Sequence, residues 1–309
     1  PKIELINEGE TTVSARKLAD LIRSVPEDTV LTFELIENQL EISALKFQAD
    51  FSTLPVGDFP VTEIQEFERE AALPGKELSD LIEKTSFAMA SQDVRYYLNG
   101  ILLEVSPSQI NVVATDGHRL AWSSCKIKTD FTDEKIIIPR KSALELQKLL
   151  NLYPENVNVA FNSNQLKVFS DEYTFISKLI EGSYPDYEKV FPKGTEQKLK
   201  ANKSLVQTAL NRAAVLSNEK YRGVKFILEK DNLKICANNP SKESAEEEVL
   251  VEYSGDSFEI GLNISYVQES LSVISNNEVE FVFFGSENSC LVKNIDDESL
   301  IHVIMPMRL

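Results

Sequence analysis

The repeating unit of this chain is clearest in residues 138–187, IPRKSALELQKLLNLYPENVNVAFNSNQLKVFSDEYTFISKLIEGSYPDY. A short apolar run is followed by about ten residues with helical spacing, a turn, and segments in which apolar and polar residues alternate. Residues 13–60 and 262–306 repeat this order of features. Lys17 and Lys141 occupy matching places near the start of the helical segment in the first two copies. A repeat of this kind predicts similar structural units along one chain.

The spacing of apolar residues predicts how these units pack. Leu18, Leu21, Ile22 and Val25 lie on one side of the first expected helix, as Val267, Leu271 and Ile274 do in the third copy. Alternating runs such as TVLTFELI (29–36) and NVNVAF (156–161) predict strands with one buried and one exposed face.

A second type of repeat lies between the first ones. Residues 76–105 and 202–230 each contain a helical segment, a polar break, an aromatic and basic stretch, and a strand. The order of half-units predicts an α+β fold with domains at 1–66, 67–187 and 188–309, the first of them only the second half of a domain. A missing half of roughly 60 residues is expected ahead of residue 1. The alternative is two unrelated α+β domains that are similar by chance.

Composition limits the classes of function. The 309 residues carry a formal charge of −17, which argues against a surface broadly coated for nucleic acid but allows a local basic face. The sequence contains no apolar run near the ~20 residues that span a bilayer and no recognisable signal peptide. Cys125, Cys236 and Cys290 are far apart and lack metal-ligand spacing, which predicts a reduced, cytoplasmic protein.

The stretch VVATDGHRLAW (112–122) is the most distinctive local motif. Its Asp-Gly step predicts a tight turn between two strands. An enzyme would use Asp116 and His118 as an acid-base pair, or Asp93 and Asp116 as metal ligands. The chain, however, has two histidines and no recognisable phosphate loop or nucleophile–His–acid set. We therefore expect no catalytic residue, no metal and no cofactor.

Basic and aromatic residues recur at matching positions of the repeats. Gln92, Arg95, Tyr96 and Tyr97 follow one expected helix, and Arg222 and Lys225 lie in the second copy of that stretch. Arg140 and Lys141 open a helical segment, as Arg16 and Lys17 do. Such residues can neutralise phosphates without reading base sequence. The alternative is an ordinary solvated surface.

Six stretches in order resemble one known family, the bacterial DNA polymerase III beta subunits, or β sliding clamps. They are SQDVRYYLNG (91–100), ATDGHRLA (114–121), PRK (139–141), YPDY (184–187), LSNEKYRGV (216–224) and VIMPMRL (303–309). The resemblance implies three-domain subunits joined head to tail in a homodimeric ring, with helices lining the hole and antiparallel sheets outside. Such a ring encircles duplex DNA, tethers polymerases and has no catalytic activity of its own. The chain departs from the family by beginning inside the first domain.

The resemblance also implies site residues. Gln92, Tyr96 and Tyr97 would contact duplex DNA directly, together with Arg95, Arg140, Lys141, Arg222 and Lys225. An acidic exterior such as 242–253 would repel DNA, so that only the hole attracts it. The opposing subunit contact would involve Lys17 and Phe51 on one side, with strand 45–51 extending a sheet, and Val215 and Leu216 on the other. Without the resemblance, Val215 and Leu216 could equally be core residues.

The turn at 115–120 would form one wall of a pocket for partner peptides that carry Leu and Phe. Its partners would be the polymerase III alpha subunit, other polymerases, the clamp loader and repair proteins. The implied pocket residues are Leu98, Thr115, Gly117, His118, Arg119, Leu120, Pro185, Lys189, Val190, Asn263, Tyr266, Val303, Ile304, Met305, Pro306, Met307 and Arg308. Two competing hypotheses are an adaptor that binds peptides without forming a ring, and a metal-dependent nuclease that uses Asp116.

Overall fold

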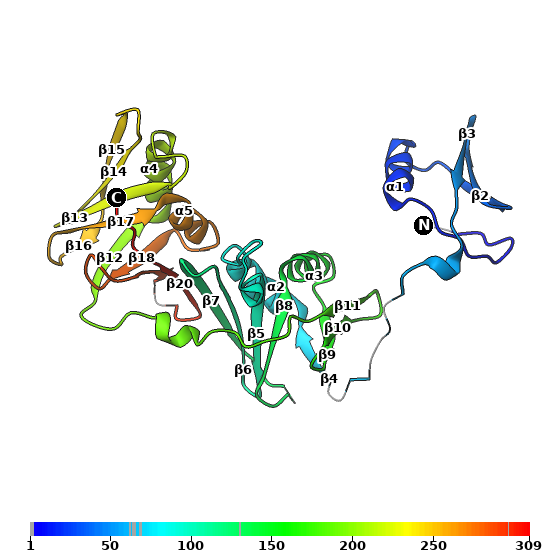
Figure 1. The fold of residues 1–309 in the computed structure, drawn as a ribbon, viewed down its shortest axis with the longest axis horizontal. Helices are drawn as coiled ribbons and strands as arrows, with labels where there is room; N and C mark the ends of the chain where they lie inside the picture. Colours follow the sequence, from blue (N-terminus) through cyan, green and yellow to red (C-terminus); the bar gives the residue numbers. More distant parts are fainter. Residues whose placement is uncertain (1–2, 62, 64–65, 68–69, 130, 296) are drawn as a thin grey trace. The chain divides into compact units, whose positions relative to one another are not determined.

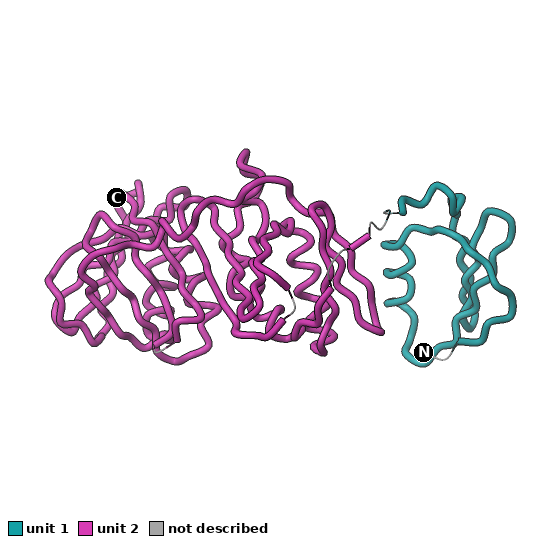
Figure 2. The backbone as a smooth tube through the Cα atoms, turned by 90° about the horizontal axis from the view of Figure 1, so that it is seen from below, with its two compact units in different colours: residues 1–64 teal, residues 65–309 magenta. Residues whose placement is uncertain are grey.

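The computed structural model describes all residues except 1–2, 62, 64–65, 68–69, 130 and 296. The chain divides into two compact units, residues 1–64 and residues 65–309 (Figure 2). The first unit has one sheet and the second unit has three among the described residues. No helix in the described ranges is long and apolar enough to cross a membrane. All three cysteines are free, and Cys290 is buried.

The first unit contains one helix and one antiparallel sheet in the order β1-β2-β3. Leu40, Ile42 and Ala44 alternate along β2 and are buried, as the period of two requires for a half-buried strand. The elements are α1 (Ala15–Ser24), β1 (Thr32–Ile36), β2 (Gln39–Ala44), β3 (Phe47–Ser52) and the short helix η1 (Val56–Asp58).

The predicted elements of this unit are confirmed, but their predicted burial is wrong. No residue of α1 is buried, and Ile22 is 43% exposed. All five residues of β1 are exposed. One helix and three short strands supply too little surface to cover two apolar faces, which explains the difference from the larger unit.

The second unit begins with a complete α+β domain. Figure 1 shows its helices α2 and α3 side by side, in keeping with the extensive contacts between them. Its elements are β4 (Glu70–Pro74), α2 (Gly75–Ser86), η2 (Tyr96–Leu98), β5 (Gly100–Ser106), β6 (Gln109–Thr115), β7 (Arg119–Lys126), β8 (Glu134–Pro139), α3 (Arg140–Leu152), β9 (Asn156–Phe161), β10 (Gln165–Phe169), β11 (Thr174–Lys178) and η3 (Tyr187–Val190).

The remainder of the second unit repeats this order. Val267 and Leu271 of its last helix and the following Ile274 are buried, as their spacing predicts. The elements are β12 (Gln197–Asn202), α4 (Lys203–Val215), β13 (Gly223–Glu229), β14 (Asn232–Asn238), β15 (Ser244–Leu250), β16 (Glu252–Tyr253), β17 (Phe258–Asn263), α5 (Ile264–Ser272), β18 (Glu278–Phe283), β19 (Cys290–Asn294) and β20 (Leu300–Ile304).

One sheet joins the two halves of the second unit. Its nine strands run β16-β12-β18-β19-β20-β7-β6-β5-β8, so β20 from the last part of the chain pairs with β7 from the middle part. The other sheets of this unit are β11-β10-β9-β4 and β15-β14-β13-β17. The β20–β7 pairing holds the two halves together through backbone hydrogen bonds.

Strand pairing defines which positions of the two halves are equivalent. Gly100 pairs with Pro139 immediately before α3, and Gly223 pairs with Asn263 immediately before α5. β7 corresponds to β15 by the same criterion. β5, β6 and β7 pair in succession, as β13, β14 and β15 do, so β7 and β15 are each the third strand of the series. The sequence repeat is therefore a structural repeat.

Candidate functional site

The turn between β6 and β7 is built by its own side chains. Asp116 Oδ1 accepts hydrogen bonds from the backbone N of His118 at 2.9 Å and of Arg119 at 3.1 Å. Thr115 Oγ1 accepts one from Gly117 N at 3.1 Å. Gly117 has φ +88°, a conformation that glycine adopts without the strain a side chain would bring. The predicted Asp-Gly turn is present, and its carboxylate has a structural role.

Arg95 covers this turn. Its Nη2 donates to Asp116 O at 3.2 Å, and a side chain at Gly117 would lie 3.0 Å from the guanidinium nitrogens. Arg95 also binds Asp93 through Nε at 3.0 Å and Nη2 at 2.8 Å. These hydrogen bonds lower the pKa of Asp93 to about 2. Asp93 is therefore an ion-pair partner of Arg95 in this structure.

Arg119 links the two halves of the second unit. Its side chain is 10% exposed. Nε binds Asp116 Oδ2 at 3.1 Å, Nη2 donates to Phe87 O at 2.7 Å, and Nη1 forms an ion pair with Glu269 of α5. The guanidinium also lies 4.3 Å from the centre of the Tyr266 ring. A planar, delocalised cation suits this combination of carboxylates, a carbonyl and an aromatic face.

The end of β20 continues along the same turn. Ile304 pairs with Arg119, and Met305 N donates to His118 O at 3.0 Å. The chain then reaches β17, where Met307 N donates to Gly261 O at 2.9 Å. The structure thus brings residues 115–120 and 303–308 together, as the resemblance implied.

The implied pocket residues differ in exposure. Leu98, Leu120, Val303 and Ile304 are at most 2% exposed, so they support this junction from within. Arg119 and Asn263 are partly exposed as well, but their side chains are engaged within the fold. The others that reach the surface, partly or fully, are Gly117, His118, Pro185, Lys189, Val190, Tyr266, Met305, Pro306, Met307 and Arg308. We call these ten residues the junction surface. A mixture of apolar and polar side chains suits an extended peptide.

Asn263 and Tyr187 position neighbouring segments. Asn263 Oδ1 accepts from the backbone N of Ser265 at 2.9 Å and of Tyr266 at 3.3 Å, so this side chain caps α5. Tyr187 is 8% exposed and donates to Glu104 Oε2 at 2.7 Å. Burial and this hydrogen bond raise the pKa of Tyr187. The Tyr187–Glu104 contact anchors the segment that carries Pro185 and Lys189, and sequence reasoning missed it.

The loop after α2 carries four of the implied DNA contacts. Gln92 is exposed with φ +58°, and Tyr96 is 58% exposed. Tyr97 is half-buried and contacts Tyr96 edge to face at 5.9 Å. Close by, Arg140 Nη1 donates to Met89 O at 3.0 Å.

The other implied DNA contacts are divided. Lys141 is exposed in the first turn of α3. Arg222 is half-buried, and its Nε donates to Ser265 Oγ at 3.3 Å. Lys225 alternates with the buried Val224 and Phe226, so it lies on the sheet face that points away from the core, where it pairs with Glu259 at 2.8 Å. The structure does not bring Lys225 together with the helix-end residues.

The residues of the implied subunit contact are accessible. Val215 is 77% exposed, Leu216 and Phe51 are half-buried, and Lys17 is exposed. The alternative that Val215 is a core residue is therefore wrong. Val215, at the end of α4, is the structural equivalent of Phe87, at the end of α2. The Phe87 ring packs edge to face on His302 of β20, with ring centres 5.1 Å apart.

His302 is a residue that sequence reasoning missed. It is 1% exposed in the β20–β7 junction, and its Nε2 lies 3.2 Å from Lys84 O. Its Nδ1 has no hydrogen-bond partner among the described residues. Burial lowers the pKa of His302 from 6.5 to about 4. A charged imidazolium would have to be buried here without an acceptor for its second proton.

Acid is therefore expected to destabilise the protein through His302. The unfolded chain takes up a proton near pH 6.5, whereas the folded chain takes it up only near pH 4. The contribution of neutral His302 to the free energy of unfolding is complete above pH 6.5 and is lost as the pH falls towards 4. At pH 5 the free energy of unfolding should be lower by roughly 2 kcal/mol. Urea unfolding at pH 7.5 and pH 5 measures this loss. His302→Gln, which cannot titrate, is the control; the same pH dependence in this variant would assign the loss to other groups.

The described residues contain no group of three or more His, Cys, Asp or Glu side chains that could hold a metal ion. Asp116 is bonded to its own turn and to Arg119. His118 is exposed, and its backbone oxygen binds Met305. The geometry of the turn is that of a support for a surface between two domains.

Comparisons with known proteins agree with this geometry. Residues 72–186 match the family model for the DNA polymerase III beta subunit, central domain, and residues 188–308 match the C-terminal domain. The beta sliding clamp of Pseudomonas aeruginosa is 43% identical over 97% of this chain and 82% of the relative, and that of Escherichia coli is 40% identical over the same shares.

Solved structures agree as well. A crystal structure of the DNA polymerase III subunit beta from Pseudomonas aeruginosa has a TM-score of 0.93 at 42% identity, covering 99% of this chain and 84% of that one. A DnaN sliding clamp from Bartonella birtlesii bound to griselimycin has a TM-score of 0.93 at 30% identity, covering 99% of this chain and 84% of that one. This chain belongs to the DNA polymerase III beta-subunit family, the β sliding clamps, which are non-catalytic processivity factors of DNA replication.

Proposed function

We propose that this chain closes a homodimeric ring around duplex DNA and holds partner proteins at the junction surface. The binding of partner proteins is inferred from one observation: residues 303–308 lie along the turn at 115–120. Met305 N donates a hydrogen bond to His118 O at 3.0 Å and holds the two segments together. Leu and Phe side chains of a partner peptide would bury apolar area against Met305, Pro306, Met307 and Pro185. Two methionines suit several ligands because their side chains repack easily.

The partners proposed for this surface are the polymerase III alpha subunit, other DNA polymerases, the clamp loader and repair proteins that carry a short binding peptide. Support comes from a Pseudomonas aeruginosa relative, 43% identical, whose crystal structure is described as bound to griselimycin. At 43% identity and a TM-score of 0.92, we infer a ligand site for this chain too. Because replication takes place there, we propose a cytoplasmic location.

For DNA, we propose a surface that comprises Gln92, Arg95, Tyr96, Tyr97, Arg140 and Lys141, with Arg222 in the equivalent stretch of the last domain. Arg95 contributes less charge than its sequence position suggests, because Asp93 neutralises it. Lys225 is left out, since it lies on the opposite face of its sheet. Hydroxyl and amide groups on the exposed side of α4, from Ser204, Thr208 and Asn211, would face DNA without fixing the ring to it.

The acidic remainder of the protein fits this arrangement. The chain has 49 acidic and 32 basic residues, and β15 carries Glu246, Glu247 and Glu248 in sequence. A ring holds DNA by enclosing it, so weak, salt-sensitive attraction in the hole is sufficient. Repulsion elsewhere would keep DNA from binding outside.

The DNA surface is tested by changing Arg95, Arg140 and Lys141 to Ala together. Neutralising fewer phosphates should weaken DNA binding and flatten its salt dependence, by about 0.9 in slope for each phosphate left without a basic partner. Fluorescence anisotropy on duplex DNA across a salt series measures the slope. Lys225→Ala is the matched control and should leave it unchanged. An equal effect of both variants would contradict the proposed surface; thermal unfolding checks the fold, because Arg95 and Arg140 also bind backbone oxygens.

A peptide-binding adaptor that forms no ring remains the second candidate, favoured by the hydrogen bonds that build the junction within one chain. The two functions differ in topology. A ring stays on nicked circular DNA after loading but slides off linear duplex, whereas an adaptor is retained on neither. Retention on both forms would indicate ordinary DNA binding instead.

A further inference from the structure

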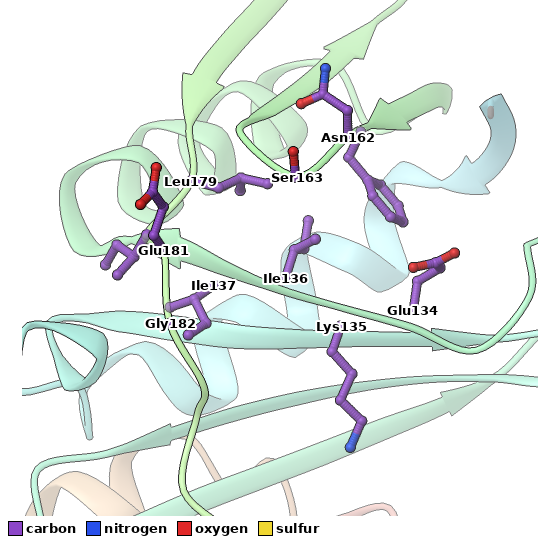
Figure 3. Close-up of a pocket in the computed structure, with 11 residues that line it drawn as sticks. Glu134, Lys135, Ile136, Ile137, Asn162, Ser163, Leu179, Glu181 and Gly182 are labelled. Atoms are coloured by element: carbon purple, nitrogen blue, oxygen red, sulfur yellow. The ribbon is translucent and has the colours of Figure 1, made fainter. Parts of the chain in front are cut away.

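A cavity of about 480 Å³ lies in the second unit, and none of the residues that line it belongs to the junction surface or to the proposed DNA surface (Figure 3). It is bounded by β8, by the turn between β9 and β10, and by residues 179–182. Ile136, Phe161 and Leu179 give it an apolar lining. Its polar lining comes from Glu134, Lys135, Asn162, Ser163 and Glu181.

The structural repeat shows what fills the equivalent position in the last domain. Glu134 of β8 pairs with Val105, and Phe258 of β17 pairs with Leu228, at the same place in each sheet. Phe161 ends β9 as Phe283 ends β18. In the last domain the Phe258 and Phe283 rings meet edge to face at 5.5 Å. Where Phe258 supplies a ring, the middle domain has the shorter, charged Glu134.

Phe131 does not close the cavity. Its ring stacks on Phe161 at 4.9 Å and 27°, but Phe131 is not among the residues that line the cavity. Phe161 therefore presents a second part of its surface to this space. An aromatic side chain entering it would find the kind of ring contact that Phe258 makes with Phe283.

Charge and backbone geometry limit what can enter. Glu134 and Glu181 both line the cavity, while Lys135 points away from Ser163 and Asn162 in Figure 3 and pairs with Glu104 at 2.6 Å. β8 is the last strand of its sheet, and Ile137 O accepts from Ile180 N at 2.9 Å. On an edge strand, the backbone N–H and C=O groups of every second residue point away from the sheet. Since those of Ile137 point this way, the backbone groups of Lys135, two residues earlier, do so too.

We propose that this cavity binds an aromatic side chain from an extended segment of a partner protein, with Lys or Arg beside the aromatic residue. The ring would occupy the position that Phe258 fills in the last domain. The basic residues would lie near Glu134 and Glu181. The backbone would run along the edge of β8 at Lys135, next to the place where Ile180 already bonds Ile137, the mode by which sheet edges add a strand. The site is separate from the junction surface and does not depend on its function.

The probe is the peptide acetyl-Arg-Phe-Arg-amide, titrated into the full chain with ¹³C-labelled isoleucine methyl groups. Its binding should shift the methyl signals of Ile136 and Ile137. Acetyl-Arg-Ala-Arg-amide and acetyl-Glu-Phe-Glu-amide should each bind about tenfold more weakly or worse, because one lacks the ring and the other the charge. Equal binding of all three peptides, or shifts confined to other isoleucines, would overturn the proposal.

Glu134→Phe places in the cavity the residue that the last domain already has, so the variant is expected to fold and to lose binding of the probe. Glu172→Phe, at an exposed turn outside the cavity, is the matched control and should bind as the original chain does. Unchanged affinity in Glu134→Phe would refute the site. If that variant fails to fold, Glu134→Gln with Glu181→Gln decides instead: weaker binding at low salt supports the site, and unchanged binding overturns it.

Discussion

Removing Met305–Leu309 is expected to weaken the binding of a Leu- and Phe-containing partner peptide by one to two orders of magnitude. Burial of each such side chain contributes roughly 1.5–3 kcal/mol, and every 1.4 kcal/mol changes affinity about tenfold. The deletion removes Met305, Pro306, Met307 and Arg308 from the junction surface. Strand β20 ends at Ile304 and keeps its pairing with β7, so the fold should remain.

Fluorescence anisotropy of a labelled Gln-Leu-x-Leu-Phe-type peptide measures this loss. His118→Ala should have a smaller effect of the same sign, because it removes one exposed ring and leaves the backbone hydrogen bond to Met305 in place. DNA binding should be the same in all three proteins, because neither change alters Gln92, Tyr96, Tyr97, Arg140 or Lys141, and Arg95 contacts the turn through Asp116 O and not through the changed residues. Equal peptide affinity in the original chain and the deletion variant would exclude the junction surface as the binding site.

The turn at 115–120 shows how far local sequence carries a prediction. Asp-Gly between two apolar runs predicts the turn, and the structure has it. The role of Arg119 depends on Glu269, which is 150 residues away, and on Phe87 O. Nothing near Arg119 in sequence indicates either partner. The resemblance gave Arg119 as a pocket residue, whereas the structure shows a guanidinium that is mostly engaged in joining two domains.

The basic residues show a different limit. The sequence repeat groups Lys225 with Arg222, because both lie in the second copy of the aromatic and basic stretch, but a strand turns successive side chains to opposite faces. Val224 and Phe226 are buried, so Lys225 has to point away from the core. Period-two alternation in GVKFILE was enough to predict this, and the grouping by proximity overlooked it. Arg95 is the reverse case, since only the structure shows that Asp93 neutralises it.

The sequence repeat predicted the architecture because each copy keeps the same elements in the same order. It did not predict the exposure of the first unit, where α1 has no buried residue. Helical spacing shows which residues share a face, while burial depends on which other elements are available to cover that face. The same repeat nevertheless predicts a contact between subunits. If two strands pair within the chain, their equivalents in the other copies of the repeat can pair between two chains.

Strands β3 and β15 are the edges that would meet between subunits. Within the chain, β20 pairs with β7. β3 is the equivalent of β20, because each is the last strand of its half-unit, and β15 is the equivalent of β7. β3 and β15 are each the outermost strand of their own sheets. A β3–β15 pair between two copies would repeat the β20–β7 pair within one. Val215 would then pack on the partner as Phe87 packs on His302.

Val215→Lys with Leu216→Lys is expected to convert the proposed dimer completely to monomer. Two ammonium groups would have to be buried at an interface with no partner for them, and this desolvation costs far more than the apolar packing there contributes. Light scattering across protein concentrations measures the change in mass. Leu205→Lys is the matched control, since Leu205 is also exposed on α4, at 56%, but near its other end. Unfolding of the double variant would show that Leu216 is needed in the core.

A cross-link tests the same interface in the positive sense. Val303 pairs with Leu120 in the β20–β7 junction. Phe51 pairs with the buried Leu40 as Ile304 pairs with the buried Cys290, so Asp50, one residue before Phe51, corresponds to Val303. Ser244 corresponds to Leu120 through the pairing of β15 with β14. Directly opposed strand residues have Cβ atoms about 4.5–5.5 Å apart, near enough for a disulfide after a small shift. Asp50→Cys with Ser244→Cys should therefore give a covalent dimer under mild oxidation, seen on a non-reducing gel. Leu45→Cys with Ser244→Cys should not, because Leu45 lies before the start of β3. Equal cross-linking in both pairs would indicate random collision, and would remove the β3–β15 pair from the proposed ring.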